Sequence, residues 1–129
     1  MRAPSVARCA LVLLAMRAHL KVRGFGPSVA WARRLGANPA GGTLPPDEVA
    51  RAAYHVALAA AFFPGRAVCL EQSLALYVLL RRRGVSADLR LGVRPYPFMA
   101  HAWVELHGEP VNEDREAVEN LRPLPEIAA

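Results

Sequence analysis

Cysteine is scarce in this chain, and its scarcity excludes two classes of protein. The 129 residues include only Cys9 and Cys69, which lie in different settings. Two cysteines cannot form the disulfide framework of a small secreted domain, and neither a CxxC pair nor the Cys/His spacing of a zinc site occurs. A reducing compartment fits best, so we expect a cytoplasmic protein with no metal and no cofactor.

Long hydrophobic runs are also missing. The longest uninterrupted apolar run near the start extends from Cys9 to Met16, which is too short to cross a bilayer. Arg2 and Arg8 before it give a faint likeness to a signal peptide, but Arg17 follows the run in place of a small-residue cleavage site. We interpret the run as part of an amphipathic helix and expect no transmembrane segment.

Acidic and aromatic residues are both in short supply. The chain has 16 Arg and Lys residues against 11 Asp and Glu, a net charge of +5, and only 7% aromatic residues. A basic excess can attract nucleic acid, an anionic membrane or an acidic peptide. No stretch interleaves basic and aromatic residues as single-strand binders do. The run from Arg81 to Arg83 favours a helix end, where cations suit the dipole, so we expect no nucleic-acid partner.

What the sequence does contain is a helical first half and an apolar centre. Apolar residues make up 53% of the chain, enough for the core of one compact domain. Proline, serine and glycine bound four expected helices, which cover residues 4–22, 27–36, 46–62 and 69–84. The last helix is apolar on all sides from Leu74 to Leu80, a pattern typical of a helix buried on most sides.

After Gly84 the spacing of the apolar residues changes from about 3.6 to 2, which indicates strands. Three antiparallel strands are expected, at residues 87–93, 99–106 and 109–113, with His107 and Gly108 as a turn and an irregular tail after Asn120. The order of elements predicts an α+β fold. We divide the one compact domain into a helical subdomain at 1–62, a core at 63–122 and an irregular tail at 123–129.

Two residues in this layout suit nucleophilic catalysis. Cys69 lies in the first turn of the buried helix, where the helix dipole favours the thiolate. His101 lies in the second expected strand between two alanines, which leave space around its ring. Each residue alone is more often structural, since a free cysteine usually behaves as a small buried apolar side chain. The order of cysteine, histidine and acid nevertheless matches the order in thiol enzymes of the papain and transglutaminase kind.

The third member depends on the register of the hairpin. A two-residue turn at His107 and Gly108 would place Asp114 opposite His101. A three-residue turn through Glu109 would place Glu113 on the same face as His101 and diagonal to it. The sequence does not choose between the two turns.

Five short segments between residues 69 and 113 resemble one family in particular. They are CLEQSLAL at 69–76, LLRRRGV at 79–85, LRLGV at 89–93, HAWVE at 101–105 and GEPVNE at 108–113. Together they resemble the transglutaminase-like leader peptidases of lasso-peptide biosynthesis, in order over roughly residues 64–114. The resemblance implies a papain- or transglutaminase-like fold and a cysteine peptidase that removes the leader from a ribosomally made precursor. It also implies three partners: the precursor's leader region, a separate leader-recognition protein and a lasso cyclase.

The resemblance assigns the site residue by residue. Cys69 matches the nucleophile, His101 the base, and Glu113 stands where the family usually has Asp, with Asp114 as the alternative. The backbone N–H of Cys69 is the first candidate for holding the oxyanion, and Gln72 is a second. Substrate contacts are expected from Gln72 and from the aromatic residues Tyr96, Phe98 and Trp103, although Trp103 also suits the core.

The length of the chain suits a stand-alone peptidase whose leader-binding domain is a separate polypeptide. Two other functions stay open at this point. One is an acyl-transferase on the same scaffold, in which an amine replaces water as the acceptor. The other is a non-catalytic scaffold that binds the leader or the cyclase.

Overall fold

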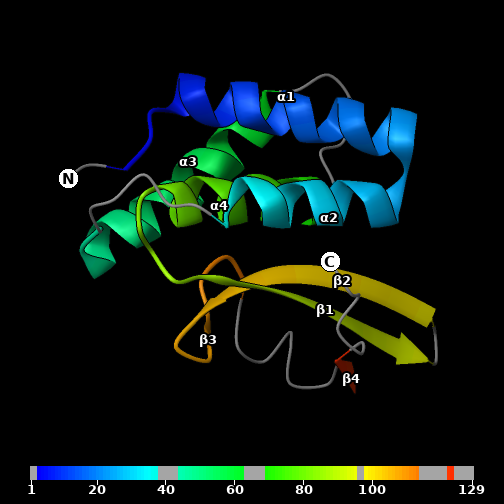
Figure 1. The fold of residues 1–129 in the computed structure, drawn as a ribbon. Helices are drawn as coiled ribbons and strands as arrows, with labels where there is room; N and C mark the ends of the chain where they lie inside the picture. Colours follow the sequence, from blue (N-terminus) through cyan, green and yellow to red (C-terminus); the bar gives the residue numbers. More distant parts are fainter. Residues whose placement is uncertain (1–2, 38–43, 63–68, 96–97, 114–121, 124–129) are drawn as a thin grey trace.

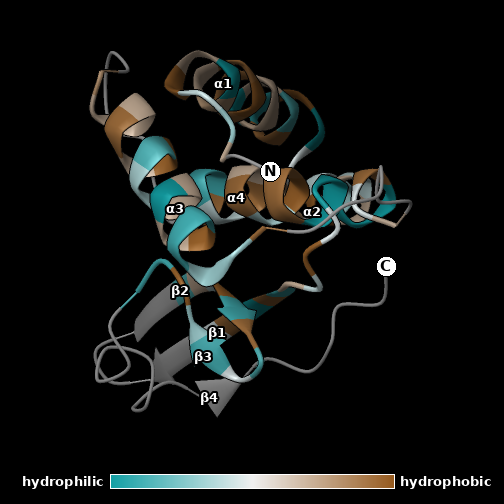
Figure 2. Cartoon of the chain, turned by 90° about the vertical axis from the view of Figure 1, so that its left-hand side faces the viewer, coloured by the Kyte–Doolittle hydropathy of each residue, from teal (hydrophilic) through white to brown (hydrophobic). Residues whose placement is uncertain are grey.

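Helices lie on one side of a small antiparallel sheet in the computed structural model of the chain (Figure 1). The structure describes residues 3–37, 44–62, 69–95, 98–113 and 122–123, and within these ranges it contains four helices and four strands. Figure 2, turned by 90°, shows the same two layers from the side. The α+β fold expected from the sequence is therefore confirmed. Among the described residues, none of the helices combines the length and the hydropathy that crossing a membrane requires.

The first two helices form a hairpin around one glycine. α1 spans Val6–Arg23, and the Ser5 side chain caps it by accepting a hydrogen bond from the Arg8 backbone N–H (3.2 Å). Gly24, at φ 85°, ends α1 and directly precedes α2, which spans Phe25–Leu35. The second helix thus begins earlier than the Pro27 expected from the sequence. Pro27 fits inside its first turn because the N–H that proline lacks would have no helical partner there.

The other two helices have the bounds that their capping residues indicate. α3 spans Pro46–Ala61, with Pro46 at its start and Asp47 and Glu48 in its first turn. α4 spans Cys69–Arg82, and the chain leaves it through Gly84 at φ 86°. The Val85 backbone N–H donates to the Leu80 carbonyl (3.0 Å), which closes the helix end.

α4 is the centre of the molecule. It contacts α1, α2 and α3 on one side and β1 and β2 on the other. Every residue from Leu74 to Leu80 is buried, as the uniformly apolar sequence predicts. The same hydrophobic cluster includes Cys9, Leu13 and Met16 of α1. Burying these side chains fixes the position of α4, and therefore the position of its first residue, Cys69.

Arg81 and Arg82, in the last turn of α4, hold the end of α2. The Arg81 Nε donates to the Gly36 carbonyl (2.9 Å), and Arg82 donates to the Leu35 carbonyl (3.4 Å). A Cβ at Gly36 would lie 2.9 Å from the Cβ of Arg81, so only glycine allows this close approach. These two arginines therefore lie at a helix end, as expected, and satisfy carbonyls that α2 leaves unpaired.

The sheet has the strand order β3-β2-β1-β4. β1 spans Asp88–Pro95 and pairs along its whole length with β2, which spans Phe98–Leu106. β3 and β4 are short, at Glu109–Pro110 and Arg122–Pro123. Two expectations were wrong: the third strand does not extend to Glu113, and the tail after Asn120 is not wholly irregular. Pro123 can pair with β1 because β4 is an edge strand, where a missing N–H is tolerated.

Candidate active site

The imidazole of His101 and the carboxylate of Glu113 are in direct contact. The Glu113 Oε2 accepts a hydrogen bond from the His101 Nε2 (2.6 Å), and their side chains are 18% and 28% exposed. An ionised carboxylate can only accept, so this contact places a proton on Nε2. The ring then presents Nδ1 as the nitrogen that can take a proton from another group.

The hairpin that brings these two residues together has a two-residue turn. Leu106 pairs with Glu109, and both turn residues, His107 (φ 53°) and Gly108 (φ 79°), have the positive φ of a type I′ turn. The alternative prediction of a three-residue turn, which would have placed Glu113 on the same face as His101, is therefore wrong. Glu113 nevertheless reaches His101 because the ladder ends at Pro110 and the chain bends at residues 111–113.

Asn112 is the side chain that redirects the chain at this bend. The Val111 N–H still donates to the Val104 carbonyl (2.8 Å). The Val104 N–H, however, donates to the Asn112 side-chain Oδ1 (2.9 Å), where regular pairing would use a backbone carbonyl. The amide group of Asn112 thus replaces one ladder bond and releases the backbone of Glu113 from the strand.

A second set of hydrogen bonds joins this bend to α4. The Ser73 hydroxyl donates to the Ala102 carbonyl (2.9 Å) and accepts a hydrogen bond from the Asn112 Nδ2 (3.1 Å). Ser73 is fully buried. It therefore connects the helix that begins at Cys69, the strand residue next to His101 and the residue before Glu113.

Helical periodicity relates Ser73 to the expected nucleophile. Residues four apart in a helix share one face, so position 69 lies one turn before Ser73 on the face of α4 that meets β2. The structure describes the backbone of Cys69 but not its side chain. The placement of position 69 supports a meeting of Cys69 and His101, and their pairing stays a prediction.

An ion pair fixes the first turn of α4 against α1. Glu71 is buried, and its carboxylate lies 3.6 Å from the Nε of Arg17. A carboxylate in a first turn suits the positive end of the helix dipole. The Arg17 guanidinium also offsets this negative charge close to position 69, where a thiolate would form.

Trp103 supports the histidine from the same face of β2. Its ring lies beside that of His101, with centroids 6.1 Å apart and an interplanar angle of 22°. The Trp103 Nε1 donates to one carboxylate oxygen of Glu105 (2.9 Å), and the other oxygen accepts from Arg90 (3.2 Å). Only 4% of Trp103 is exposed, so its ring packs against the site in this structure, and a peptide contact by Trp103 stays a prediction.

The remaining predicted site residues are placed less fully. Gln72 is half-buried in α4. Tyr96 and Asp114 lie outside the described residues, and for Phe98 only the backbone at the start of β2 is described. Sequence reasoning missed Ser73 and the bridging role of Asn112. The spacing of four residues between Cys69 and Ser73 was the one local signal for the serine.

Metal-binding side chains do not gather in the described ranges, where no group of three or more His, Cys, Asp or Glu residues could hold an ion. The chemistry that the described site supports is proton transfer at His101, with Glu113 to orient the ring and stabilise its charged form.

Ser73→Ala is expected to lower the free energy of unfolding by about 1–3 kcal/mol, because the buried Ala102 carbonyl and the Asn112 amide both lose a partner. Urea unfolding measures the change. Ser86→Ala is the matched control, since Ser86 is exposed. Equal stability of the two variants would show that the bridge between α4 and the bend contributes nothing.

Comparison with known proteins places this chain in a family. The family model described as the transglutaminase-like superfamily matches residues 12–126. The microcin J25-processing protein McjB of Escherichia coli is 39% identical over 59 residues, which are 46% of this chain and 28% of that protein. The match thus spans less than a third of the relative's length. No solved structure gave a significant match.

Proposed function

The chain belongs to the transglutaminase-like superfamily, and from this premise we propose that it is a cysteine peptidase that removes the leader from a lasso-peptide precursor. The single observation that carries the proposal is the 2.6 Å contact between Glu113 and His101, which lies in the strand that α4 meets through Ser73. The similarity to a microcin J25-processing protein supports a peptide precursor as the substrate.

The first step is activation of the thiol. His101 Nδ1 takes the proton from the Cys69 thiol, while Nε2 keeps its hydrogen bond to Glu113. The carboxylate stabilises the imidazolium that forms, and the start of α4 stabilises the thiolate. Glu113 therefore acts through His101 and does not touch the substrate.

The thiolate then attacks the carbonyl carbon at the junction of leader and core. The backbone N–H of Cys69 is the first candidate donor to the oxyanion, because it lies at the start of α4 and is not used within the helix. As the tetrahedral intermediate collapses, His101 gives its proton to the nitrogen of the core peptide. The core leaves with a free α-amine, and the leader stays on Cys69 as a thioester.

Water completes the cycle. His101 removes a proton from a water molecule, the resulting hydroxide attacks the thioester, and the leader departs with a carboxylate. The thiolate of Cys69 is regenerated and takes up a proton. A lasso cyclase could then use the free α-amine of the core.

We expect this chain alone to cleave its precursor slowly and a separate leader-recognition protein to raise the rate. Cleavage at Cys69 and His101 requires contact with only the few residues around the scissile bond. When a partner holds a distant part of the leader, binding of the leader-core junction to the peptidase becomes an intramolecular step. The effective concentration of the junction is then around the millimolar range. Mass spectrometry of the precursor over time, with and without the partner, measures both rates.

Product mass separates the outcomes of this experiment. Hydrolysis gives a leader with a free carboxylate, which supports the peptidase. A leader joined to an amine would instead show an acyl-transferase, and an intact precursor under both conditions would contradict catalysis. Equal rates with and without the partner would contradict only the division of labour.

A further inference from the structure

The basic excess of this chain is confined to its first third. Residues 1–46 contain seven basic residues and no acidic one, whereas residues 47–129 contain nine basic and eleven acidic residues. The seven are Arg2, Arg8, Arg17, Lys21, Arg23, Arg33 and Arg34. The hairpin of α1 and α2 therefore carries a positive field, while the rest of the chain is slightly acidic.

A pocket of about 580 Å³ opens between these two helices. Its aromatic part consists of two stacked rings: those of His19 and Trp31, with centroids 4.4 Å apart and an interplanar angle of 16°. The His19 Nδ1 also shares a hydrogen bond with the hydroxyl of Ser28 (2.7 Å), which is fully buried. The pocket thus has a preformed apolar surface, which reduces the entropy lost when a ligand is bound.

Two arginines complete the pocket. Arg23 of α1 and Arg34 of α2 line it, and both are exposed. Pro27 and Ala30 are the other described residues that line it, and none of the described lining residues carries a carboxylate. Among the described residues, no acidic side chain forms an ion pair with either arginine. Both guanidinium groups are therefore available to an anionic ligand.

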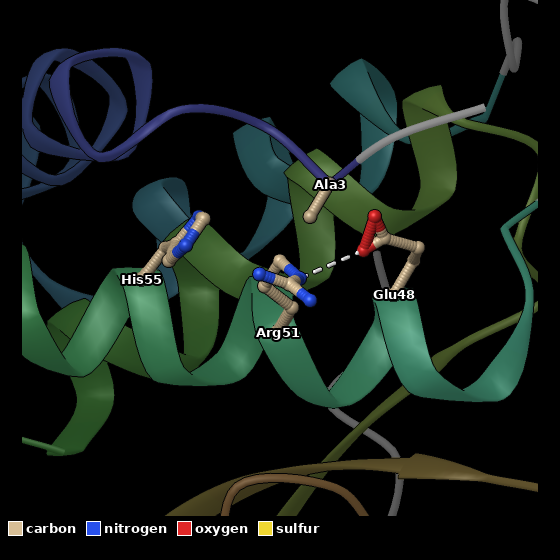
Figure 3. Close-up of a pocket in the computed structure, with 4 residues that line it drawn as sticks. All are labelled: Ala3, Glu48, Arg51 and His55. Carbon is tan, nitrogen blue, oxygen red and sulfur yellow. Dashed lines mark hydrogen bonds and ion pairs between the residues drawn. The ribbon is translucent and has the colours of Figure 1, made fainter.

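Other arginines of the chain are used differently. Figure 3 shows a pocket on α3 in which Arg51 points toward Glu48, and their side chains form an ion pair (3.0 Å). His55, beside them, donates to the Pro4 carbonyl (2.7 Å) and so holds the start of the chain. That pocket contains its own counter-charge, whereas the described lining of the pocket between α1 and α2 contains none.

We propose that the pocket between α1 and α2 binds an acidic segment of the precursor's leader, with a carboxylate on Arg23 and Arg34 and an adjacent apolar side chain against Trp31. The inference rests on the proposed function for its ligand. Charge complementarity favours an acidic peptide, and a concave site of this volume suits one or two side chains of an extended segment. A nucleic acid would need a longer basic track with several aromatic platforms.

The test uses the full chain carrying Cys69→Ala, so that binding is measured without cleavage. The probe is a fluorescein-labelled decapeptide of alternating Glu and Leu, and its counterpart with Gln in place of Glu is the control ligand. Anisotropy gives the dissociation constants. Arg23→Gln combined with Arg34→Gln is compared with Arg51→Gln combined with Arg90→Gln, two exposed arginines whose replacement changes the net charge equally.

The proposal expects the acidic probe to bind and the Gln probe not to bind. The Arg23 and Arg34 pair of substitutions should weaken binding about tenfold, as for two modest exposed ion pairs, and the control pair less than twofold. Equal weakening by both pairs would show a nonspecific response to net charge and overturn the pocket. Tighter binding of anionic vesicles or single-stranded DNA, with the same dependence on Arg23 and Arg34, would also overturn it.

Cleavage of a short peptide that spans only the junction separates this inference from the proposed function. If the wild-type chain cleaves that peptide and the arginine pair has no effect on probe binding, the pocket fails and the peptidase stands. If the probe binds as expected but no junction peptide is cleaved, the pocket stands as an acidic-peptide site and the peptidase fails.

Discussion

Cys69→Ala is expected to abolish leader removal, with a loss on the order of 10⁴- to 10⁶-fold, while the protein stays folded. The substitution removes the sulfur that attacks the junction carbonyl, and the other parts of the site cannot form a thioester. The effect on stability should be small because alanine is well tolerated at the start of a helix such as α4. Mass spectrometry of the precursor measures the rate, and circular dichroism verifies the fold.

Cys9→Ala is the matched control for this prediction. Cys9 is fully buried in α1, and burial raises the pKa of its thiol to about 11. The thiol therefore stays protonated at neutral pH and is not a nucleophile. Cys9→Ala should leave the cleavage rate nearly unchanged, with only the modest stability loss of a small core truncation. Substantial cleavage by the Cys69→Ala variant would contradict the proposed peptidase activity, whatever the result for Cys9→Ala.

Helix bounds could be read from the sequence because the groups that cap a helix are local. Ser5 caps α1 through a residue three positions away, and Pro46 begins α3 where the sequence places it. The apolar run in α4 predicted its burial from composition alone. The start of α2 was placed two residues too late because Gly24 both ends one helix and precedes the next without a linker.

The hairpin could not be read in the same way, because its bend depends on a distant residue. His107 and Gly108 can form a two-residue turn, but they are not the Asn-Gly or Asp-Gly pair that signals one strongly. The bend at residues 111–113 depends on Asn112, whose side chain bonds to Ser73, 39 residues away in the sequence. No pattern within the strand indicates a contact of that range.

The short strand β4 was missed for a related reason. Pro123 signals irregular structure locally, and proline is rare inside a sheet. Its pairing with Gly92 depends on β1 having an open edge after β2 has paired with the other side. Whether that edge is open depends on the assembled sheet. The sequence pattern of residues 88–95 therefore cannot predict that another strand pairs there.

Glu113→Gln is expected to lower kcat by about 10²- to 10⁴-fold with little change in KM. Glu113 Oε2 holds His101 at 2.6 Å, and the amide of glutamine cannot stabilise the imidazolium as a carboxylate does. An amide N–H directed at Nε2 would also favour the tautomer that protonates Nδ1, which is the wrong one for accepting the thiol proton. Because both side chains are partly exposed, water can replace some of this support, which sets the lower end of the range.

Two further variants decide whether Glu113 orients His101 or only stabilises the bend. Glu113→Asp keeps the negative charge and should retain a large part of kcat, since the leader peptidases that this chain resembles usually have aspartate at this position. Asp114→Asn should change kcat by only a few-fold. Unfolding in urea must show both Glu113→Gln and Glu113→Asp to be about as stable as the wild-type chain, because a purely structural role would lower stability in both. If Asp114→Asn is the damaging change and Glu113→Gln is not, the acid has been assigned one residue too early, and the contact between His101 and Glu113 is not the catalytic one.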